Sequence, residues 1–303
     1  MISILIPNFN YNCQELVQNL ADEAEQLQTE IEIILGDDAS TLTSLHAIYH
    51  QLEKLPNLQI IKNEINLGRE KTRVKLAHQA QFNWLLFLDA DVLPKKKNFI
   101  GSYIEAVQTH EGVDVVFGGI AYHEKPKNNE YLLRWKYGKA KEEQSLASRK
   151  KNRYRSLISG AICIKKSVFL KHSSVQHNRY GLDVFRAYQL QIAKAKVIHI
   201  ANPVLHLGLE TNTAFLAKTK ESWKSIIFLE NENFISKDFR PVQKAYLKIE
   251  KYGLLRFVNL LYAIFKNFLI KKSTGNNPSI FWFDVYRMFY FCHLKTQKYL
   301  KNE

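Results

Sequence analysis

A single stretch, Trp84 to Asp91, limits the folds open to this chain more than any other. It reads Trp-Leu-Leu-Phe-Leu-Asp-Ala-Asp, an unbroken apolar run that stops at two carboxylates. A short apolar run of this kind is typical of a strand that is buried on both faces of a sheet. Because successive side chains of a strand point to opposite faces, Asp89 and Asp91 are expected on the same side, where the strand ends.

Two neighbouring carboxylates at the edge of a core need a partner, because an unpaired charge is costly to remove from water. A hard divalent cation would neutralise both, and diphosphate oxygens could complete its coordination shell. The alternative is that Asp89 and Asp91 are turn residues ahead of Pro94, where Asp commonly accepts hydrogen bonds from backbone amides. The residues alone leave both interpretations open.

Short apolar strands alternate with helical segments along the chain. This alternation predicts an α/β fold with a mostly parallel central sheet that helices cover on both faces. Ligands of such sheets bind beyond the carboxyl ends of the strands, where the polar loops of this chain also lie. Besides the strand that starts at Trp84, strands are predicted at 3–6, 31–35, 58–61, 113–117, 159–164 and 197–200, and helical patterns run through 16–24, 45–52, 69–75, 166–170 and 185–192.

The chain carries 43 basic and 29 acidic residues, a net charge of +14, which favours anionic partners such as phosphates or a membrane surface. Nucleic acid is not favoured, because no RNP-type, KH or helix-turn-helix pattern accompanies the charge. A dinucleotide or P-loop site is not indicated either, since neither glycine-rich phosphate signature occurs. Residues 125–155 hold 11 Lys/Arg and 3 Glu, and we interpret them either as a mobile cover over an anionic site or as a solvated surface excursion.

Cys13, Cys163 and Cys292 are far apart and show no Cys-x-x-Cys spacing, so neither a disulfide framework nor a thiolate metal site is indicated. A reducing cytoplasm fits this usage. No signal peptide is expected, because the apolar stretch at the start stops at Pro7, and the best candidate for a spanning helix is interrupted by Arg256 and Lys266. The protein is therefore expected in the cytoplasm.

The C-terminal region, 231–303, is expected to be helical and basic. From Lys251 onward it has 9 basic and 2 acidic residues, which suggests a separate role. A second segment, 280–294, is rich in aromatic residues. Amphipathic helices of this kind lie on anionic bilayers, although faces packed against the catalytic domain or a second subunit would show the same pattern. The apolar residues that recur at helical spacing are Leu254, Phe257, Val258, Leu261, Ile264, Phe265 and Phe268.

The loops after the predicted strands resemble, in order, those of the GT-A glycosyltransferases, specifically the family-two group of inverting enzymes. The resemblance covers residues 1–230, which would form the catalytic domain, with 231–303 as a helical appendage. It rests on segments Ser3–Asn10, Gly36–Ser40, Asn66–Gly68, Thr72–Arg73 and Phe87–Asp91, with Tyr180–Asp183 and Asn202–Glu210 similar to a bacterial branch of the group.

The resemblance implies a role for each matched residue. Asp91, Asp89 and His206 would hold Mn²⁺ or Mg²⁺, and Asp183 would be the general base. The alternative for Asp183 is a helix N-cap, and for His206 it is a core histidine. Leu182 also departs from the Glu that the family usually has there. The residues expected to bind the donor are Pro7, Phe9 near the base, Asp38 as an acceptor from the base, Asn66, Gly68, Arg73 and Asp89.

The implied reaction is an inverting, metal-dependent transfer of a sugar from a nucleotide-diphosphate donor to an acceptor hydroxyl. A UDP-sugar is the favoured donor, the acceptor would be a glycan or a lipid-linked molecule, and the product would belong to a cell-surface glycan. One alternative is a catalytically lapsed basic module that binds RNA or anionic membrane. A nucleotidyltransferase on the same scaffold is less favoured, because its glycine-rich entry loop is absent.

Overall fold

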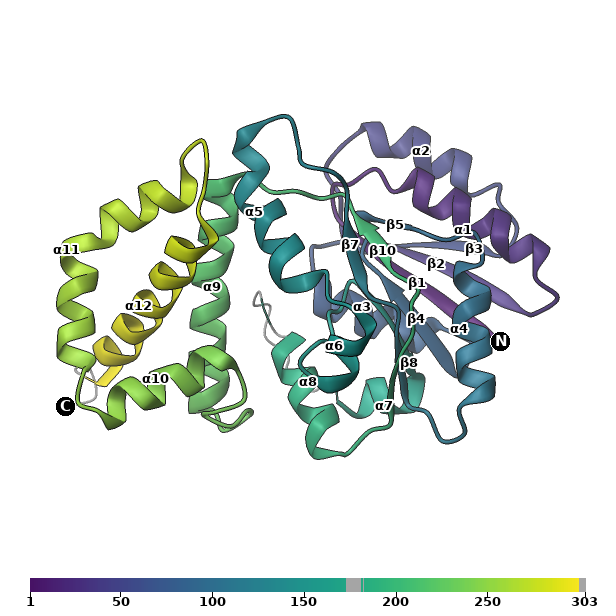
Figure 1. Cartoon of the computed structure of the whole chain (residues 1–303). Coiled ribbons are helices and arrows are strands. Elements are labelled where there is room, and N and C mark those ends of the chain that lie inside the picture. The colour runs from purple at the N-terminus through teal and green to yellow at the C-terminus, as the bar shows by residue number, and fades with distance from the viewer. Residues whose placement is uncertain (173–180, 182, 300–303) are drawn as a thin grey trace. The chain divides into compact units, whose positions relative to one another are not determined.

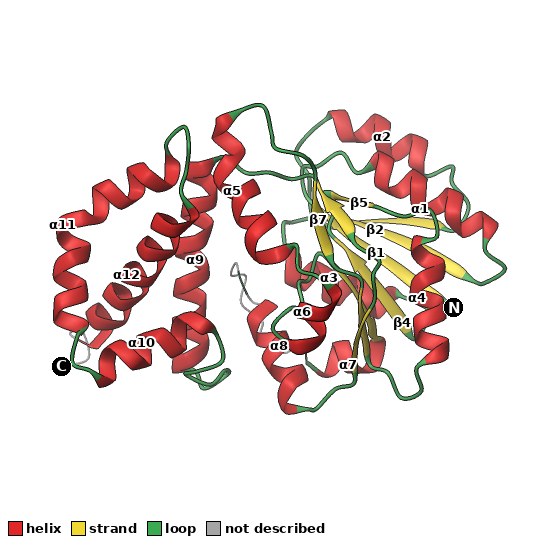
Figure 2. Cartoon of the chain, in the orientation of Figure 1, coloured by secondary structure: helices red, strands yellow, loops and turns green. Residues whose placement is uncertain are grey.

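The computed structural model describes residues 1–172, 181 and 183–299, which form two compact units (Figure 1). Unit 1 comprises the described residues of Met1–His123, Glu142–Asn178 and Gln189–Gly208. Unit 2 comprises those of Glu124–Lys141, Arg179–Tyr188 and Leu209–Glu303. The strands all belong to unit 1, whereas unit 2 is helical within the described residues (Figure 2).

A seven-stranded, mostly parallel sheet forms the centre of unit 1, as the alternating pattern predicts. Its strand order is β3-β2-β1-β4-β8-β6-β9. β1 to β4 are parallel to one another, whereas β8 runs antiparallel between β4 and β6. The apolar run of β4 is completely buried from Leu85 to Leu88, because the strand is central and helices cover both faces of the sheet. The strands are β1 (Ile2–Asn8), β2 (Ile31–Asp37), β3 (Leu58–Lys62), β4 (Trp84–Leu88), β6 (Val115–Phe117), β8 (Ala161–Lys165) and β9 (Val197–His199).

Two groups of helices cover the large sheet (Figure 2). From β1 to β3 the chain moves in one direction across the sheet, and it reverses to reach β4. Since such crossovers are right-handed, the reversal places α3 on the face opposite α1 and α2. The helices of unit 1 are α1 (Gln14–Gln26), α2 (Ser44–Leu52), α3 (Arg69–Gln79), α4 (Phe99–Thr109), which we did not predict, α6 (Leu146–Lys151) and α7 (Lys166–Lys171).

A second, three-stranded sheet in unit 1 has the order β5-β10-β7. Its strands are β5 (Val92–Pro94), β7 (Ile120–Tyr122) and β10 (Val204–His206). We did not predict them, because three residues are too few to show alternation. β5 begins one residue after Asp91, so this sheet continues directly from the central carboxylates.

The basic stretch 125–155 is divided between the two units, and neither expected interpretation fits its buried arginines. Arg149, on α6, is buried and donates hydrogen bonds to the carbonyl oxygens of Phe117 at 3.1 Å and Ile200 at 2.9 Å. Arg134, in unit 2, is also buried and pairs with Glu210 at 3.2 Å. These arginines hold the stretch in place.

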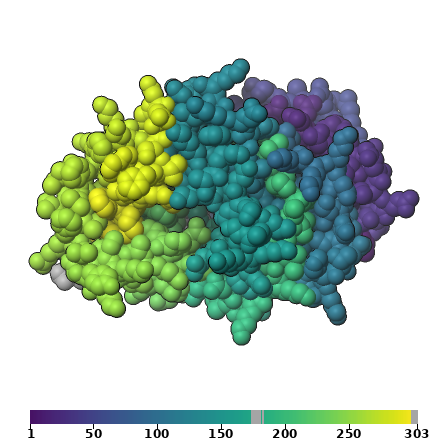
Figure 3. Space-filling view, viewed as in Figure 1, coloured from purple at the N-terminus to yellow at the C-terminus, as the bar shows by residue number. Residues whose placement is uncertain are grey.

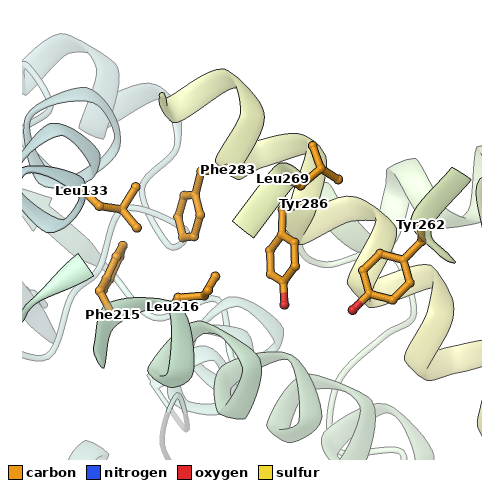
Figure 4. Packing of buried hydrophobic residues seen from close by; sticks show 7 residues of the cluster. All are labelled: Leu133, Phe215, Leu216, Tyr262, Leu269, Phe283 and Tyr286. Carbon is orange, nitrogen blue, oxygen red and sulfur yellow. The ribbon is translucent and has the colours of Figure 1, made fainter. Parts of the chain in front are cut away.

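Unit 2 is built around an aromatic core (Figure 4). Phe215 on α9 packs against Phe283 on α12, with ring centres 5.6 Å apart, and Leu133 on α5 points toward the same place. Because α9 contributes to this core, the expected boundary at residue 230 falls inside unit 2, at the end of that helix. The helices are α5 (Leu132–Tyr137), α9 (Asn212–Asn231), α10 (Pro241–Lys251), α11 (Leu255–Thr274) and α12 (Ile280–Tyr299). α8 (Asp183–Ile192) begins in unit 2 and ends in unit 1.

The expected C-terminal helices are confirmed as α11 and α12. Among the described residues, no single helix has both the length and the apolar composition needed to cross a membrane. α10 and α11 pass that test together, but they meet at a bend of 116°.

Candidate active site

The carboxyl ends of three strands bring polar side chains to one edge of the large sheet. β1 and β2 are in register, so Asn8 lies beside Asp37. β4 pairs with the other side of β1, and Asp89 comes directly after its last residue, Leu88. The reversal of strand order thus lies between β1 and β4, where α/β sheets bind their ligands.

Asp38 holds the loop 63–68 in place. Its Oδ1 accepts hydrogen bonds from Asn63 Nδ2 and Leu67 N, both at 2.8 Å, and its Oδ2 accepts from Gly68 N at 2.8 Å. Asn66 Nδ2 donates to the carbonyl oxygen of Asp38 at 3.2 Å. Gly68 has a φ of +82°, a conformation that favours glycine. Asp38 is buried and shapes this loop, and its expected contact with a base stays a prediction.

The turn after β1 is hydrogen-bonded to the loop after β2. Asn10 Oδ1 accepts from Thr41 N at 2.7 Å and from Leu42 N at 3.2 Å. Pro7 is the last residue but one of β1, and Phe9 follows the strand with 49% of its surface exposed. A large exposed aromatic ring on a fixed turn is suited to stacking on a flat ligand such as a base.

Asp89 is paired with two arginines of α3. Arg73 Nη2 lies 2.7 Å from Asp89 Oδ1, and Arg69 Nη2 lies 3.2 Å from Asp89 Oδ2. Arg73 is completely buried and also donates to the carbonyl oxygen of Ser159 at 2.8 Å. Arg69 donates to the Ser159 hydroxyl, and its side chain is 45% exposed. Both oxygens of Asp89 thus face guanidinium groups, although we had expected this carboxylate to ligate a metal as well.

Asp91 lies against His206. Its Oδ2 is 3.6 Å from His206 Nε2. The antiparallel pairing of β5 with β10, which sets His206 opposite Val92, accounts for this closeness, and Leu207 N donates to the Asp91 carbonyl oxygen at 2.8 Å. A Cβ atom on Gly208 would lie only 1.9 Å from Asp91 Oδ2. Glycine at this position therefore leaves room for the carboxylate.

Burial raises the pKa of Asp91, and the charge of Asp89 acts in the same direction, while His206 and Arg69 oppose the shift. A carboxylate whose charged form is disfavoured in this way is stabilised by a nearby cation.

Asp91 and His206 fit a metal site with two protein ligands. A carboxylate is a ligand of both Mn²⁺ and Mg²⁺, with water and diphosphate oxygens filling the other positions, whereas an imidazole ligand favours a transition metal such as Mn²⁺ over Mg²⁺. His206 Nδ1 is buried and has no hydrogen-bond partner in the described part of the chain. No cluster of three or more His, Cys, Asp or Glu suited to a metal occurs among the described residues. A bound ion would therefore depend on the donor for several of its ligands.

Several residues of the site were not predicted. Arg69 could have been found, because it lies four positions before Arg73 and so on the same face of a helix. Tyr122 donates from its hydroxyl to Glu142, and its ring centre lies 5.4 Å from that of His206. No sequence signal marks Tyr122 or Glu142, since one lies on a three-residue strand and the other in a single turn of π-helix.

The proposed base, Asp183, is the first residue of α8 and belongs to unit 2. Its negative charge at the start of a helix is favourable to the helix dipole. Tyr180 and Leu182 of the same motif lie outside the described residues. Asp183 and the carboxylates that follow β4 belong to different units, and the role of Asp183 stays a prediction from the sequence.

Comparison with known proteins agrees with the fold. The model of glycosyl transferase family 2 matches residues 3–176. An uncharacterized glycosyltransferase of Haemophilus influenzae is 31% identical over 107 residues, which cover 35% of this chain and 35% of the relative. The match thus spans about a third of that curated relative.

Two solved structures share the arrangement of the chain. S. aureus TarS residues 1–349, in complex with UDP-GlcNAc, aligns with 97% of this chain and 92% of its own at a TM-score of 0.50 and 17% identity. The mannosyltransferase PcManGT of Pyrobaculum calidifontis, in complex with GDP-Man and Mn²⁺, aligns with 100% of this chain and 87% of its own at a TM-score of 0.55 and 13% identity. These likenesses confirm the expected GT-A fold.

Proposed function

Because the chain belongs to glycosyl transferase family 2, we propose that it moves a sugar from a nucleotide-diphosphate donor to an acceptor hydroxyl, with inversion at the sugar carbon. One observation carries the proposal: Arg69 and Arg73 meet Asp89 at the strand edge beside the Asp91–His206 pair. Cations next to a two-ligand metal site suit a diphosphate, which brings negative charge and oxygen ligands together.

The residues of unit 1 would bind and orient the donor. Arg69, whose side chain is partly exposed, would contact the diphosphate, while the buried Arg73 fixes Asp89 in position. Phe9 would stack on the base. Asp91 and His206 would hold Mn²⁺ or Mg²⁺, and such an ion stabilises the charge that develops on a leaving diphosphate.

Asp183 would act on the acceptor. The acceptor oxygen forms a bond to the anomeric carbon while the bond from that carbon to the diphosphate breaks, and the electron pair leaves with the diphosphate. The proton of the acceptor hydroxyl passes to the Asp183 carboxylate, which must come within about 3 Å of it. A single displacement of this kind inverts the sugar carbon and needs no covalent enzyme intermediate.

We further propose a UDP-sugar as donor and a glycan or lipid-linked acceptor in cell-surface glycan synthesis, at the inner face of the cell membrane. The solved structures in complex with UDP-GlcNAc and GDP-Man support a nucleotide sugar in general. The net charge of +14 supports a location next to an anionic surface.

The metal site is tested with Asp91→Asn. In calorimetry, Mn²⁺-dependent binding of UDP-sugars should weaken at least about tenfold, because a ligand of the ion is lost. The matched control is Asp22→Asn, the same change at an exposed position of α1. Unchanged Mn²⁺-dependent affinity in the Asp91 variant would remove this residue from the site.

The base is tested with Asp183→Asn. Transfer to a confirmed acceptor should be lost while donor binding is kept, because the base acts on the acceptor alone. If the variant turned over normally, Asp183 would serve only as the start of α8. If no nucleotide sugar bound the wild-type chain with Mn²⁺, and salt-sensitive RNA binding appeared instead, the alternative of a lapsed basic module would replace the enzyme.

A further inference from the structure

α11 is apolar on two opposite faces, and only one of them is covered. Its inner face, with Val258, Tyr262 and Leu269, is buried in unit 2, where α12 lies alongside (Figure 1). We call the opposite side the outer stripe. Its members are between 43% and 62% exposed, and they are Leu254, just before the helix, Phe257, Leu260, Ile264 and Phe268.

The outer stripe is continuous. Phe257, Leu260, Ile264 and Phe268 follow one another at spacings of three and four, which places them in one row along a helix. From Leu254 to Phe268 the row is roughly 20 Å long at the rise of an α-helix. In Figure 3 the yellow-green atoms of α11 lie at the surface of unit 2. Exposed apolar surface of this extent marks a place where something else binds.

The charges around the outer stripe indicate which kind of partner can bind to it. α11 contains no Asp or Glu, and its four cations, Arg256, Lys266, Lys271 and Lys272, are all exposed. Lys272 Nζ lies 5.7 Å from the ring centre of Phe268, so its apolar stem follows the stripe while its charge stays at the end. A second copy of the chain would bring another cationic border against this one, and the like charges would repel.

We infer that the outer stripe of α11 is the surface by which the protein docks on an anionic lipid bilayer. The inference rests on the proposed location at a membrane and assigns it to one face of one helix. The apolar side chains enter the boundary between headgroups and acyl chains, and the cations at the borders meet anionic headgroups. Tyr252 and Phe281, which are 71% and 66% exposed, add aromatic rings of the kind enriched at membrane interfaces.

The test is flotation of the full chain with vesicles of phosphatidylcholine, with and without phosphatidylglycerol. The wild-type protein should float only with vesicles that contain phosphatidylglycerol. The triple variant Leu260→Gln, Ile264→Gln, Phe268→Gln should lose flotation, while Leu42→Gln, at an exposed leucine of unit 1, should keep it. Because the changed side chains are exposed, the triple variant should unfold at the wild-type temperature.

A second variant tests the cations at the end of the outer stripe. Lys271→Glu with Lys272→Glu should weaken partitioning by about tenfold or more, since each cation near an anionic surface contributes about fivefold. The matched control is Lys96→Glu with Lys97→Glu, the same charge change at two exposed positions of unit 1.

Three results would overturn the inference: no flotation of the wild-type protein, flotation that the triple variant keeps, or a lipid-free dimer that the triple variant breaks. The third would assign the stripe to a second copy. Mn²⁺-dependent donor binding, measured on the same proteins, should be equal in all of them. If donor binding fails while flotation depends on the stripe, the proposed transfer is wrong and the docking surface stands.

Discussion

Gly208 and the carboxylate of Asp91 compete for the same space at the scale of single residues. A Cβ at position 208 would lie 1.9 Å from Asp91 Oδ2, so Gly208→Ala must push the carboxylate away from His206. We expect Mn²⁺-dependent nucleotide binding to weaken by about tenfold or more, although no charge changes. Calorimetry with UDP in the presence and absence of Mn²⁺ measures this.

The control for Gly208 is Gly112→Ala. Gly112 has a φ of +66° and no atom near its Cβ position, so an alanine there costs stability through backbone strain without touching the site. The metal-dependent part of the affinity should be normal in this variant. Equal metal dependence in the Gly208 variant would mean that Asp91 does not need its present position.

Substitutions of the two arginines that pair with Asp89 should affect stability and donor binding differently. Arg73 is buried, so Arg73→Met should lower the free energy of unfolding by about 3 kcal/mol, because it breaks a buried ion pair. Arg69 is 45% exposed, so Arg69→Met should cost less than about 1 kcal/mol while still weakening donor binding. Urea unfolding and calorimetry on both variants check this. A greater loss of stability in the Arg69 variant than in the Arg73 variant would contradict a stabilising buried ion pair between Arg73 and Asp89.

Only part of the site could be predicted from single residues. Strand alternation is enough to place Asp89 and Asp91 together at a strand end. Their different partners could not be predicted, because Arg69 and His206 reach them from α3 and β10 through tertiary packing. Asp38 belongs to the expected loop, but the three hydrogen bonds that it accepts depend on how residues 63–68 fold back.

At the scale of elements, the turn after α6 is joined to β9 through His199. His199 Nε2 donates to the carbonyl oxygen of Arg153 at 2.9 Å, and the ring is buried. Burial lowers the pKa of His199 to about 4, the cations of Arg149, Arg153 and Lys150 act in the same direction, and the hydrogen bond opposes them. The folded protein therefore holds this histidine neutral.

The depressed pKa predicts acid sensitivity. Between pH 6.5 and about 4 the unfolded chain binds a proton at His199 that the folded protein does not. The free energy of unfolding is therefore unaffected by the protonation of His199 above pH 6.5. As the pH falls from 6.5 to about 4, it decreases by up to about 3 kcal/mol. Urea unfolding across this range should show the slope, and His199→Gln should flatten it. An unchanged slope in the variant would assign the acid sensitivity to other groups.

The elements of the large sheet were predictable because each strand is short, apolar and bounded by turn residues. The direction of β8 was not, since an apolar run such as Ala161–Lys165 reads the same in both directions. The strands β5, β7 and β10 escape prediction because they have three residues each, and only pairing with one another defines them.

At the scale of the whole molecule, the charge along the sequence and the contacts within the fold place the boundary between the two parts of the chain differently. The excess charge after Lys251 suggests a separate tail, whereas the core of unit 2 also takes in α5 and α9, and unit 2 includes the start of α8. That core depends on aromatic contacts between segments far apart in the sequence, such as Phe215 with Phe283. Charge counts carry no information about such contacts.

The place of β8 between β4 and β6 has a consequence for the order of synthesis. When β4 leaves the ribosome it can pair with β1, but its other neighbour begins only at Ala161, 73 residues after Leu88 (161 − 88). At about 5–20 residues per second this gap lasts roughly 4–15 s. During that time the apolar strand that ends just before Asp89 and Asp91 is an open sheet edge on the nascent chain, where cellular chaperones can act.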